Sequence, residues 1–358
     1  MSAPSVRSTK KTAPGKRGRA RPGNTPLTMR DVAAMAGVSV GTVSKVLNEA
    51  PGVSPETRSR VLQMIQDLDY HPDASAQSLV ARKTGSIGFI IPHTGNYSMS
   101  GAYWPILLTA ITEKAAARNL NVLLSTARSE EDVDSAYRTI LRGRRVDGLV
   151  VGGEQFGQKQ LVELLFKGFP FVMVGQSPFV THCHVEVDNR GGAASMTRHL
   201  VDLGHRKITM LVGPPDRTAI RERIAGYESV MAAAGLEPRI HHFDYFDEGF
   251  SPAIREALIA DPRPSAVFAA AGDLVIPALS AARELRLTIP SDLAFGAFDD
   301  HPFFSYFSPP ITTVSQPVHD IGETALDLLF ALMDGKEPQS VVLPTKLVVR
   351  ESCGAGHR

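Results

Sequence analysis

Short β-forming runs alternate with helix-length amphipathic stretches over most of this chain of 358 residues. The first half carries such runs at 87–91, 122–125, 148–151 and 171–174, and the second half repeats the pattern at 207–212, 266–270 and 293–298. Strands that alternate with helices form parallel sheets with helices on both faces. Two such units in series predict an α/β body of two parallel-sheet lobes over residues 85–350. Ligands bind such a fold at the carboxyl ends of the strands.

Length and composition narrow the class of protein further. An apolar content of 43% is enough to bury the cores of more than one domain. No apolar run approaches the roughly 20 residues that a membrane span needs, and the N-terminus has no apolar core of a signal peptide. The two cysteines, Cys183 and Cys353, cannot make a disulfide framework. We therefore expect a cytoplasmic protein without a membrane partner.

The charge is distributed unevenly, although the net charge is only +1. Residues 1–26 contain seven lysines and arginines and no acid, together with Pro, Gly, Ser and Thr. Such a composition cannot bury a core, which predicts a disordered basic arm. The arm is either a solvated tail without a task or a source of non-specific attraction to DNA phosphates.

Two helix signatures follow the arm. Thr28 stands where an N-cap is needed, with Asp31 three positions later as in a capping box. Gly37 suits the left-handed conformation that ends a helix, and Ser39 supplies the next N-cap. Two short helices joined by a tight turn make a helix-turn-helix.

The second of these helices has an inner and an outer face. Val43 and Leu47, with Val46, are spaced to pack against the first helix. The outer face is left with Val40, Gly41, Ser44 and Lys45. In a helix-turn-helix, such outward side chains enter the major groove, where Lys45 is suited to reading guanine. The alternative is that Ser44 and Lys45 only solvate an amphipathic helix.

A third helix opens at Ser54-Pro55 and stops at His71-Pro72. This predicts an all-α DNA-binding head over residues 27–72. Residues 73–81 then have the pattern of one more helix, too short to be stable alone. We assign residues 73–84 to a hinge helix and linker that orders when docked, and residues 351–358 to a C-terminal tail.

Several motifs in this order resemble the lactose-repressor (LacI/GalR) family of transcriptional regulators over about residues 27–349. The head motifs are Thr28-Met29-Arg30-Asp31-Val32-Ala33, Ala36-Gly37-Val38-Ser39 and Thr42-Val43-Ser44-Lys45-Val46-Leu47-Asn48. Those of the body are Arg145-Val146-Asp147-Gly148-Leu149, Val187-Asp188-Asn189, Leu203-Gly204-His205-Arg206, Phe298-Asp299-Asp300 and Pro309-Pro310-Ile311-Thr312-Thr313-Val314.

The resemblance implies a homodimer that binds a palindromic double-stranded DNA operator, with a periplasmic-binding-protein-like body. The last helix, near residues 318–333, would return to the first lobe, and three crossovers would act as a hinge. Paired hinge helices would insert Leu79, with Ala76 beside it, into the minor groove; the alternative for Leu79 is a linker residue packed on the body. The predicted DNA contacts are Thr28, Ser39, Val40, Gly41, Thr42, Ser44, Lys45, Asn48, Ala76 and Leu79.

The resemblance also implies a small-molecule effector between the lobes. Arg221 aligns with the family's ligand-binding arginine and Asp299 with its ligand-binding aspartate. A guanidinium facing a carboxylate suits a polyhydroxylated ligand such as a sugar, because the pair donates to and accepts from neighbouring hydroxyls. The alternative is a salt bridge between the lobes.

Aromatic and glycine positions complete the predicted effector site. Tyr103 and Trp104 align with an aromatic pair at the pocket mouth, although such a pair is more often core, and His93 follows the first strand. Glycines stand where family members carry polar side chains, at Gly152, Gly175 and Gly272. With a long loop over 93–102, they suggest a pocket for an oligosaccharide. The predicted effector contacts are His93, Tyr103, Trp104, Arg221, Gly272 and Asp299.

Two other classes of protein are less compatible with the sequence. A solute-binding protein for transport shares the two-lobed body, but it needs an export signal and no DNA-binding head. A DNA-tethered enzyme would need a catalytic group, and His241-His242 with Asp244 lacks a third metal ligand at a convincing spacing. We therefore predict a regulator, most simply a repressor, at the nucleoid, with no enzymatic activity, cofactor or metal.

Overall fold

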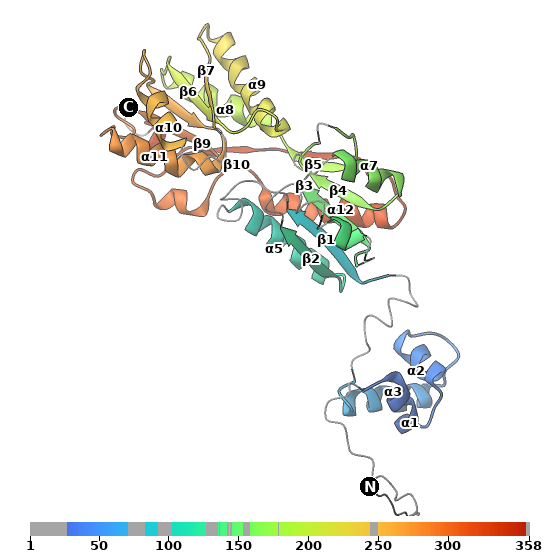
Figure 1. Cartoon of the computed structure of the whole chain (residues 1–358). Coiled ribbons are helices and arrows are strands. Elements are labelled where there is room, and N and C mark those ends of the chain that lie inside the picture. Colours follow the sequence, from blue (N-terminus) through green and yellow to red (C-terminus); the bar gives the residue numbers. More distant parts are fainter. Residues whose placement is uncertain are drawn as a thin grey trace, which may run out of the picture. The chain divides into compact units, whose positions relative to one another are not determined.

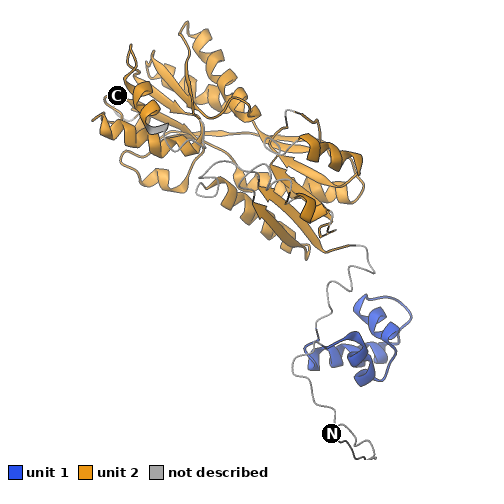
Figure 2. Cartoon of the chain, in the orientation of Figure 1, with its two compact units in different colours: residues 1–80 blue, residues 81–358 orange. Residues whose placement is uncertain are grey.

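The structure of the chain is a computed structural model (Figure 1). The structure describes residues 27–70, 83–91, 102–126, 135, 137–141, 143, 145–152, 158–177, 179–243 and 250–355. It divides into two compact units, Met1–Val80 and Ala81–Arg358 (Figure 2). No helix in these described ranges is both long and apolar enough to cross a membrane.

The first unit is a three-helix head. Its helices are α1 (Met29–Ala36), α2 (Val40–Leu47) and α3 (Pro55–Asp67). One small core holds them together, made of Val32, Ala33, Ala36, Val43, Val46, Val61 and Tyr70. The predicted inner face of α2 is correct: Val43 and Val46 are buried in this core, and the partly buried Leu47 packs against it.

The second unit contains two six-stranded sheets, as the alternating pattern predicted. The first has the order β11-β5-β4-β3-β1-β2, with every pair parallel. Its strands are β1 (Ser86–Ile91), β2 (Asn121–Thr126), β3 (Gly148–Gly152), β4 (Phe171–Val174), β5 (His184–Val187) and β11 (Val341–Leu343). The helices packed on it are α5 (Tyr103–Ala116), α7 (Gln158–Phe166) and α12 (Val318–Met333).

Strand β1 shows how the sheet is covered on both faces. Ile87, Phe89 and Ile91 lie in the cluster that includes α5 and α12. Ile90 lies in the opposite cluster, with Leu161 of α7. All four β1 side chains are buried, because alternate residues of a strand point to opposite faces. A nearly continuous apolar run is therefore what a strand with two covered faces requires.

The second lobe is built in the same way. Its sheet has the order β12-β10-β9-β8-β6-β7 and is parallel except for the β10–β12 pair. The strands are β6 (Ile208–Val212), β7 (Arg239–His242), β8 (Ala266–Ala269), β9 (Ala294–Phe298), β10 (Thr312–Ser315) and β12 (Lys346–Val348). The α-helices are α8 (Asn189–Asp202), α9 (Thr218–Ala233), α10 (Phe250–Ile259) and α11 (Val275–Glu284), and the 3-10 helices are η1 (Gly272–Leu274), η2 (Pro302–Tyr306) and η3 (Glu351–Cys353).

The chain passes between the two lobes three times (Figure 1). Asp188 links β5 to α8, Gln316-Pro317 links β10 to α12, and Pro344-Thr345 links β11 to β12. The first and third crossovers are joined by hydrogen bonds, since Asp188 N donates to Leu343 O at 2.9 Å and Thr345 Oγ1 donates to Asp188 O at 3.4 Å. Helix α12 packs on α5 and the first sheet, so the predicted return of the last helix to the first lobe is correct.

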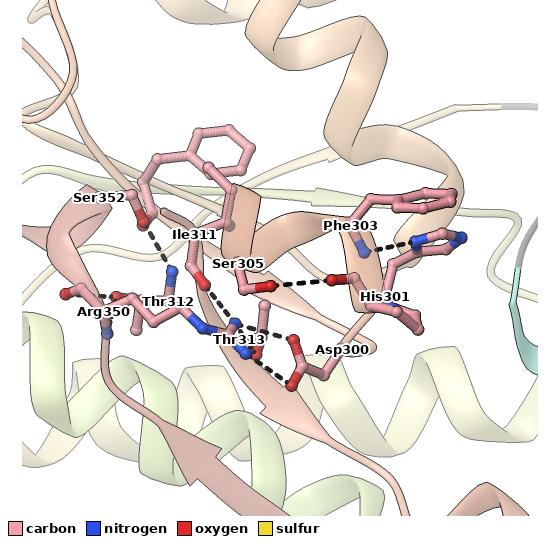
Figure 3. Close-up of polar contacts among 11 residues, drawn as sticks. Asp300, His301, Phe303, Ser305, Ile311, Thr312, Thr313, Arg350 and Ser352 are labelled. Carbon is pink, nitrogen blue, oxygen red and sulfur yellow. Dashed lines mark hydrogen bonds and ion pairs between the residues drawn. The ribbon is translucent and has the colours of Figure 1, made fainter. Parts of the chain in front are cut away.

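Residues 351–355 belong to the second lobe, in contrast to the predicted tail over 351–358. The Ser352 side chain is fully buried, and its hydroxyl donates to Phe295 O at 2.6 Å and accepts from Thr312 N at 2.8 Å. Just before it, Arg350 pairs with both carboxylate oxygens of Asp300, at 2.8 and 2.9 Å (Figure 3). Residues 351–355 thus pack against the first residues of β9 and β10. A short polar sequence at a chain end gives no sign of such burial.

Candidate DNA-binding and effector sites

Local hydrogen bonds fix the two helices of the predicted helix-turn-helix. Asp31 Oδ2 accepts from Thr28 N at 2.8 Å and from Thr28 Oγ1 at 2.7 Å, and these bonds hold the pKa of Asp31 below its usual value. Gly37 ends α1 with φ +66°. Ser39 Oγ then accepts from Thr42 N at 3.1 Å and starts α2. The turn is therefore set by the capping residues that the sequence predicted.

Helix α2 and its two capping residues present several side chains to solvent. Among the predicted DNA contacts, Ser39, Val40, Gly41, Lys45 and Asn48 are exposed. On the exposed side of α2, Gly41 has no side chain and Lys45 carries a positive charge. This combination suits a close approach to base edges in a major groove.

The remaining polar side chains of α2 are engaged within the head. Thr42 Oγ1 lies 2.9 Å from Ser39 Oγ, and Asn48 Nδ2 donates to the carbonyl of Ser44 at 2.9 Å. Thr42 and Ser44 are half-buried. Their local bonds support the helix ends, and their contact with DNA stays a prediction, as does that of the exposed Thr28 at the start of α1.

Three predicted contacts lie outside the described residues. These are Ala76 and Leu79 of the expected hinge helix and His93 of the first-lobe loop. Their roles remain predictions.

The second lobe gathers polar groups at the carboxyl ends of β8 and β9. Asp299 directly follows β9 and has φ +73°, a left-handed conformation that few residues other than glycine adopt. Its Oδ2 accepts from Gly272 N at 3.0 Å, and its Oδ1 accepts from Gln316 Nε2. The carboxylate is thus held between the end of β8 and the second crossover, at the strand ends where α/β folds bind ligands.

The arginine beside Asp299 is Arg223, which corrects the pairing expected for Arg221. Arg223 Nη1 lies 3.9 Å from Asp299 Oδ2. Arg221, on the exposed side of α9, donates to Asp216 O at 2.8 Å and to Thr218 Oγ1 at 3.1 Å. Side chains two positions apart on a helix point to different sides, so only one of the two arginines can face the carboxylate.

Arg223 is buried and held on several sides. Its Nε donates to Asn189 Oδ1 at 2.8 Å and its Nη1 to Ala270 O at 2.8 Å. The guanidinium also stacks over the ring of Phe298, 3.7 Å from the ring centre. The separation of 3.9 Å from Asp299 exceeds a hydrogen bond. Cation and anion therefore remain available to donate to and accept from a third group.

Gly272 contributes a backbone N–H to the candidate site, and the absence of its side chain does not enlarge the site. A Cβ at this position would lie 3.3 Å from both the Cβ and Oδ2 of Asp299. The room left by the missing side chain is therefore taken by the carboxylate. This corrects the expectation that Gly272 widens the pocket, and it gives the glycine a different task, the N–H that holds Asp299.

The aromatic pair packs on the core of the first lobe. Tyr103 and Trp104 form an edge-to-face pair with ring centres 5.1 Å apart, and Trp104 lies 6.2 Å from Phe89. Both are partly buried against the cluster under α5. The core interpretation that the sequence left open accounts for these contacts, and their predicted role at a ligand stays a prediction.

Two half-buried carboxyl groups, Asp273 and Glu186, have raised pKa values. Burial, with the Asp299 carboxylate close by, raises the pKa of Asp273 to about 6, although Arg217 opposes this shift. Burial also raises the pKa of Glu186, against hydrogen bonds from Val187, Gln176 and Asn189 and the charge of Arg223. Carboxyl groups with shifted pKa values are common at ligand sites.

Comparison with known proteins agrees with both halves of this geometry. The model for bacterial regulatory proteins of the lacI family matches residues 28–73, and the model for a periplasmic binding protein-like domain matches residues 197–353. The HTH-type transcriptional regulator CelR of Thermobifida fusca is 33% identical over 336 residues, covering 91% of this chain and 98% of CelR. The chain belongs to the LacI family.

Two solved structures extend the comparison of this LacI-family chain. The CelR–cellobiose complex shares 31% identity with a TM-score of 0.69, covering 91% of this chain and 99% of that one. The Lac repressor dimer bound to operator and the anti-inducer ONPF shares 26% identity with a TM-score of 0.81, covering 92% and 99%. The chain is a DNA-binding transcriptional regulator with a helix-turn-helix head and a periplasmic-binding-protein-like body.

Sequence reasoning missed several residues of this candidate site, and the sequence held a signal for one of them. The buried positions of α9 include Ile220, Arg223, Tyr227 and Val230, a helical spacing that places Arg223 inward and Arg221 outward. No comparable signal pointed to Asn189, Gln316 or Asp273. These residues meet only because the crossovers and two strand ends converge.

Proposed function

We propose that this protein is a homodimeric repressor that binds a palindromic operator and is controlled by a cellobiose-like oligosaccharide held by Arg223 and Asp299. The observation that carries the proposal is the pairing of a buried guanidinium with a carboxylate at the carboxyl ends of β8 and β9. Such a pair can donate to one sugar hydroxyl and accept from its neighbour. The similarity to CelR, whose solved complex contains cellobiose, supports this ligand class.

The effector site adjoins the crossovers, which suggests how binding reaches DNA. Asp299 is bonded to Gln316 of the second crossover, and Arg223 is bonded to Asn189 beside the first. A ligand that binds one lobe arrangement more tightly shifts the population toward it. Moving a regulator from nearly all bound to nearly all released takes about 5 kcal/mol of differential affinity. The paired hinge helices with Ala76 and Leu79 would form in one arrangement and melt in the other.

Exposed apolar side chains support a dimer. Ile276 on α11 is 63% exposed, and Phe303 and Tyr306 on η2 are 65% and 84% exposed. Both elements pack on the same core cluster of the second lobe. Contiguous exposed apolar patches mark protein interfaces, and we propose that these three side chains belong to one such patch. The Lac repressor in complex with operator is a dimer, which is consistent with this assignment.

On DNA, the proposed contacts combine the exposed start of α2 with the basic arm. Lys45 would read a base edge, Val40 would contact a thymine methyl, and the capping residues would lie near the phosphates. The seven cations of residues 1–26 would add salt-dependent phosphate attraction. We place this activity at the nucleoid in the cytoplasm, and it requires binding but no catalysis.

Selection of bound duplexes from a random pool tests the proposal. We expect a palindromic consensus to emerge, and cellobiose to change the affinity for that consensus at least about tenfold. Failure to enrich any palindrome contradicts the operator assignment. Enrichment with no response to cellobiose, but with a response to a simple hexose, contradicts the oligosaccharide assignment alone.

A further inference from the structure

Asn189 connects the two lobes with a single side-chain amide. It is the first residue of α8, directly after the first crossover, and is 4% exposed. Its Nδ2 donates to Glu186 Oε1 of β5 at 2.9 Å, and its Oδ1 accepts from Arg223 Nε of α9 at 2.8 Å. Because an arginine offers no acceptor and a carboxylate offers no donor, the amide can lie in only one orientation.

This bond decides which way the Arg223 guanidinium faces. Arg223 Nε donates to Asn189 Oδ1 and Nη1 donates to Ala270 O. These bonds hold the guanidinium plane over the ring of Phe298, with Nη1 3.9 Å from Asp299 Oδ2. Without the Asn189 oxygen, Nε loses its partner, and a buried guanidinium satisfies itself with the nearest carboxylate. Direct pairing with Asp299 would then occupy both groups that the ligand needs.

Glu186 anchors the other end of the amide in the first lobe. Its Oε1 accepts from Val187 N at 2.8 Å in addition to Asn189. One neutral amide therefore joins the guanidinium to Glu186 of β5, two residues before the crossover residue Asp188. Neither bond involves the head or the exposed surface.

We propose that Asn189 is a positioning residue that aims Arg223 at the effector and couples the guanidinium to the first crossover. This inference rests on the proposed role of Arg223 in effector binding. It assigns a task to the Val187-Asp188-Asn189 motif, which effector and DNA contacts leave unexplained.

Three variants of the full chain separate the two bonds. Asn189→Ala removes both the acceptor for Arg223 and the donor to Glu186. Asn189→Asp keeps an oxygen for Arg223 Nε, adds a charge that is favourable at a helix N-terminus, and loses the donor to Glu186. Arg198→Ala is the control, because Arg198 is an exposed residue of the same helix.

The first measurement needs no ligand. The NMR signal of the Arg223 Nε–H group reports its acceptor, and it is assigned by its loss in Arg223→Lys. We expect this signal to move in Asn189→Ala, to return toward its original shift in Asn189→Asp, and to stay in Arg198→Ala. A signal unchanged in Asn189→Ala overturns the proposal, whatever sugar the protein binds.

The second measurement uses cellobiose as the probe. We expect Asn189→Ala to weaken cellobiose binding at least about tenfold, and Asn189→Asp to keep it within about threefold. In Asn189→Asp, the change in operator affinity caused by saturating cellobiose should shrink at least about threefold. Equal weakening in both variants, or full coupling in Asn189→Asp, overturns the proposal. If the unaltered protein binds no cellobiose, the effector assignment fails, and the Arg223 signal still decides the role of Asn189.

Discussion

Arg223 and Asp299 face each other across 3.9 Å without a hydrogen bond, while each is held in place by other groups. A buried ion pair that served only stability would close to a direct contact, because the desolvation cost is otherwise not recovered. The open geometry is better explained by a ligand whose hydroxyls complete it.

Replacing Arg223 by lysine tests this geometry. Lysine keeps the charge but lacks the planar fork that reaches Asn189 and Ala270 together. We expect Arg223→Lys to weaken cellobiose binding by roughly tenfold to a hundredfold, as loss of a charged hydrogen bond does. Arg221→Lys is the matched control and should change the affinity less than about threefold in calorimetry. If the two substitutions weaken cellobiose binding equally, Arg223 has no special role in binding the effector.

The pKa of Asp273 predicts how stability depends on pH. Because burial raises this pKa to about 6, the folded protein holds the proton more tightly than the unfolded chain. The contribution of Asp273 to stability is therefore present at low pH and lost as the pH rises through about 6. Asp273→Asn removes this loss and should stabilise the protein by on the order of 1 kcal/mol near pH 7.5, with a smaller gain near pH 5.

Thermal unfolding at the two pH values measures this difference. Asp202→Asn, at an exposed position on α8, is the control and should give the same small change at both. An Asp273→Asn variant whose gain does not grow with pH would show that Asp273 titrates as an ordinary carboxyl.

The fold was predictable where a strand is covered on both faces, because such a strand appears in the sequence as a continuous apolar run. Strands β1, β3, β6, β8 and β9 are buried runs between helices, and their existence and order follow from alternation alone. The short strands β11 and β12 are partly exposed. They lie at the sheet edges, where three residues carry no period that distinguishes a strand from a loop.

The candidate site was predictable only in part, for a related reason. Asp299 and Gly272 were found because each lies next to an apolar strand, but the partner of Asp299 was misplaced by two residues along α9. Asn189 and Gln316 come from crossovers that are distant in sequence and meet only through the three-pass topology. Helix periodicity shows which side of α9 is buried, but it does not show which residues of other elements that side contacts.

The buried C-terminus gives a third prediction. Ser352→Ala leaves Thr312 N and Phe295 O without the hydroxyl that satisfies both, and we expect a loss of about 1–3 kcal/mol in unfolding free energy. Ser305→Ala removes an exposed hydroxyl of the same lobe (Figure 3) and should be nearly neutral. Likewise, truncation after Arg350 should lower the melting temperature more than truncation after Ala355. Equal melting temperatures would restore the interpretation of 351–355 as a tail.

Lys45 provides a fourth prediction, for DNA binding. Lys45→Ala removes a side chain that we propose reads a base. We expect this variant to lose about 1–3 kcal/mol of operator binding free energy and to become less selective at one base pair. Arg60→Ala, on the exposed side of α3, removes the same charge and serves as the control in fluorescence anisotropy. We expect Arg60→Ala to leave selectivity unchanged. If both variants lose affinity equally and keep selectivity, Lys45 contributes only charge.

The most direct test joins the two halves of the account in one titration. The affinity of the full chain for its selected operator is measured with increasing cellobiose, for the unaltered protein and for Arg223→Lys. We expect cellobiose to change the operator affinity of the unaltered protein at least about tenfold, and to have little effect on the variant at the same concentrations. An identical cellobiose response in both proteins, or a selected operator that the unaltered protein binds no better than scrambled DNA, would contradict the account.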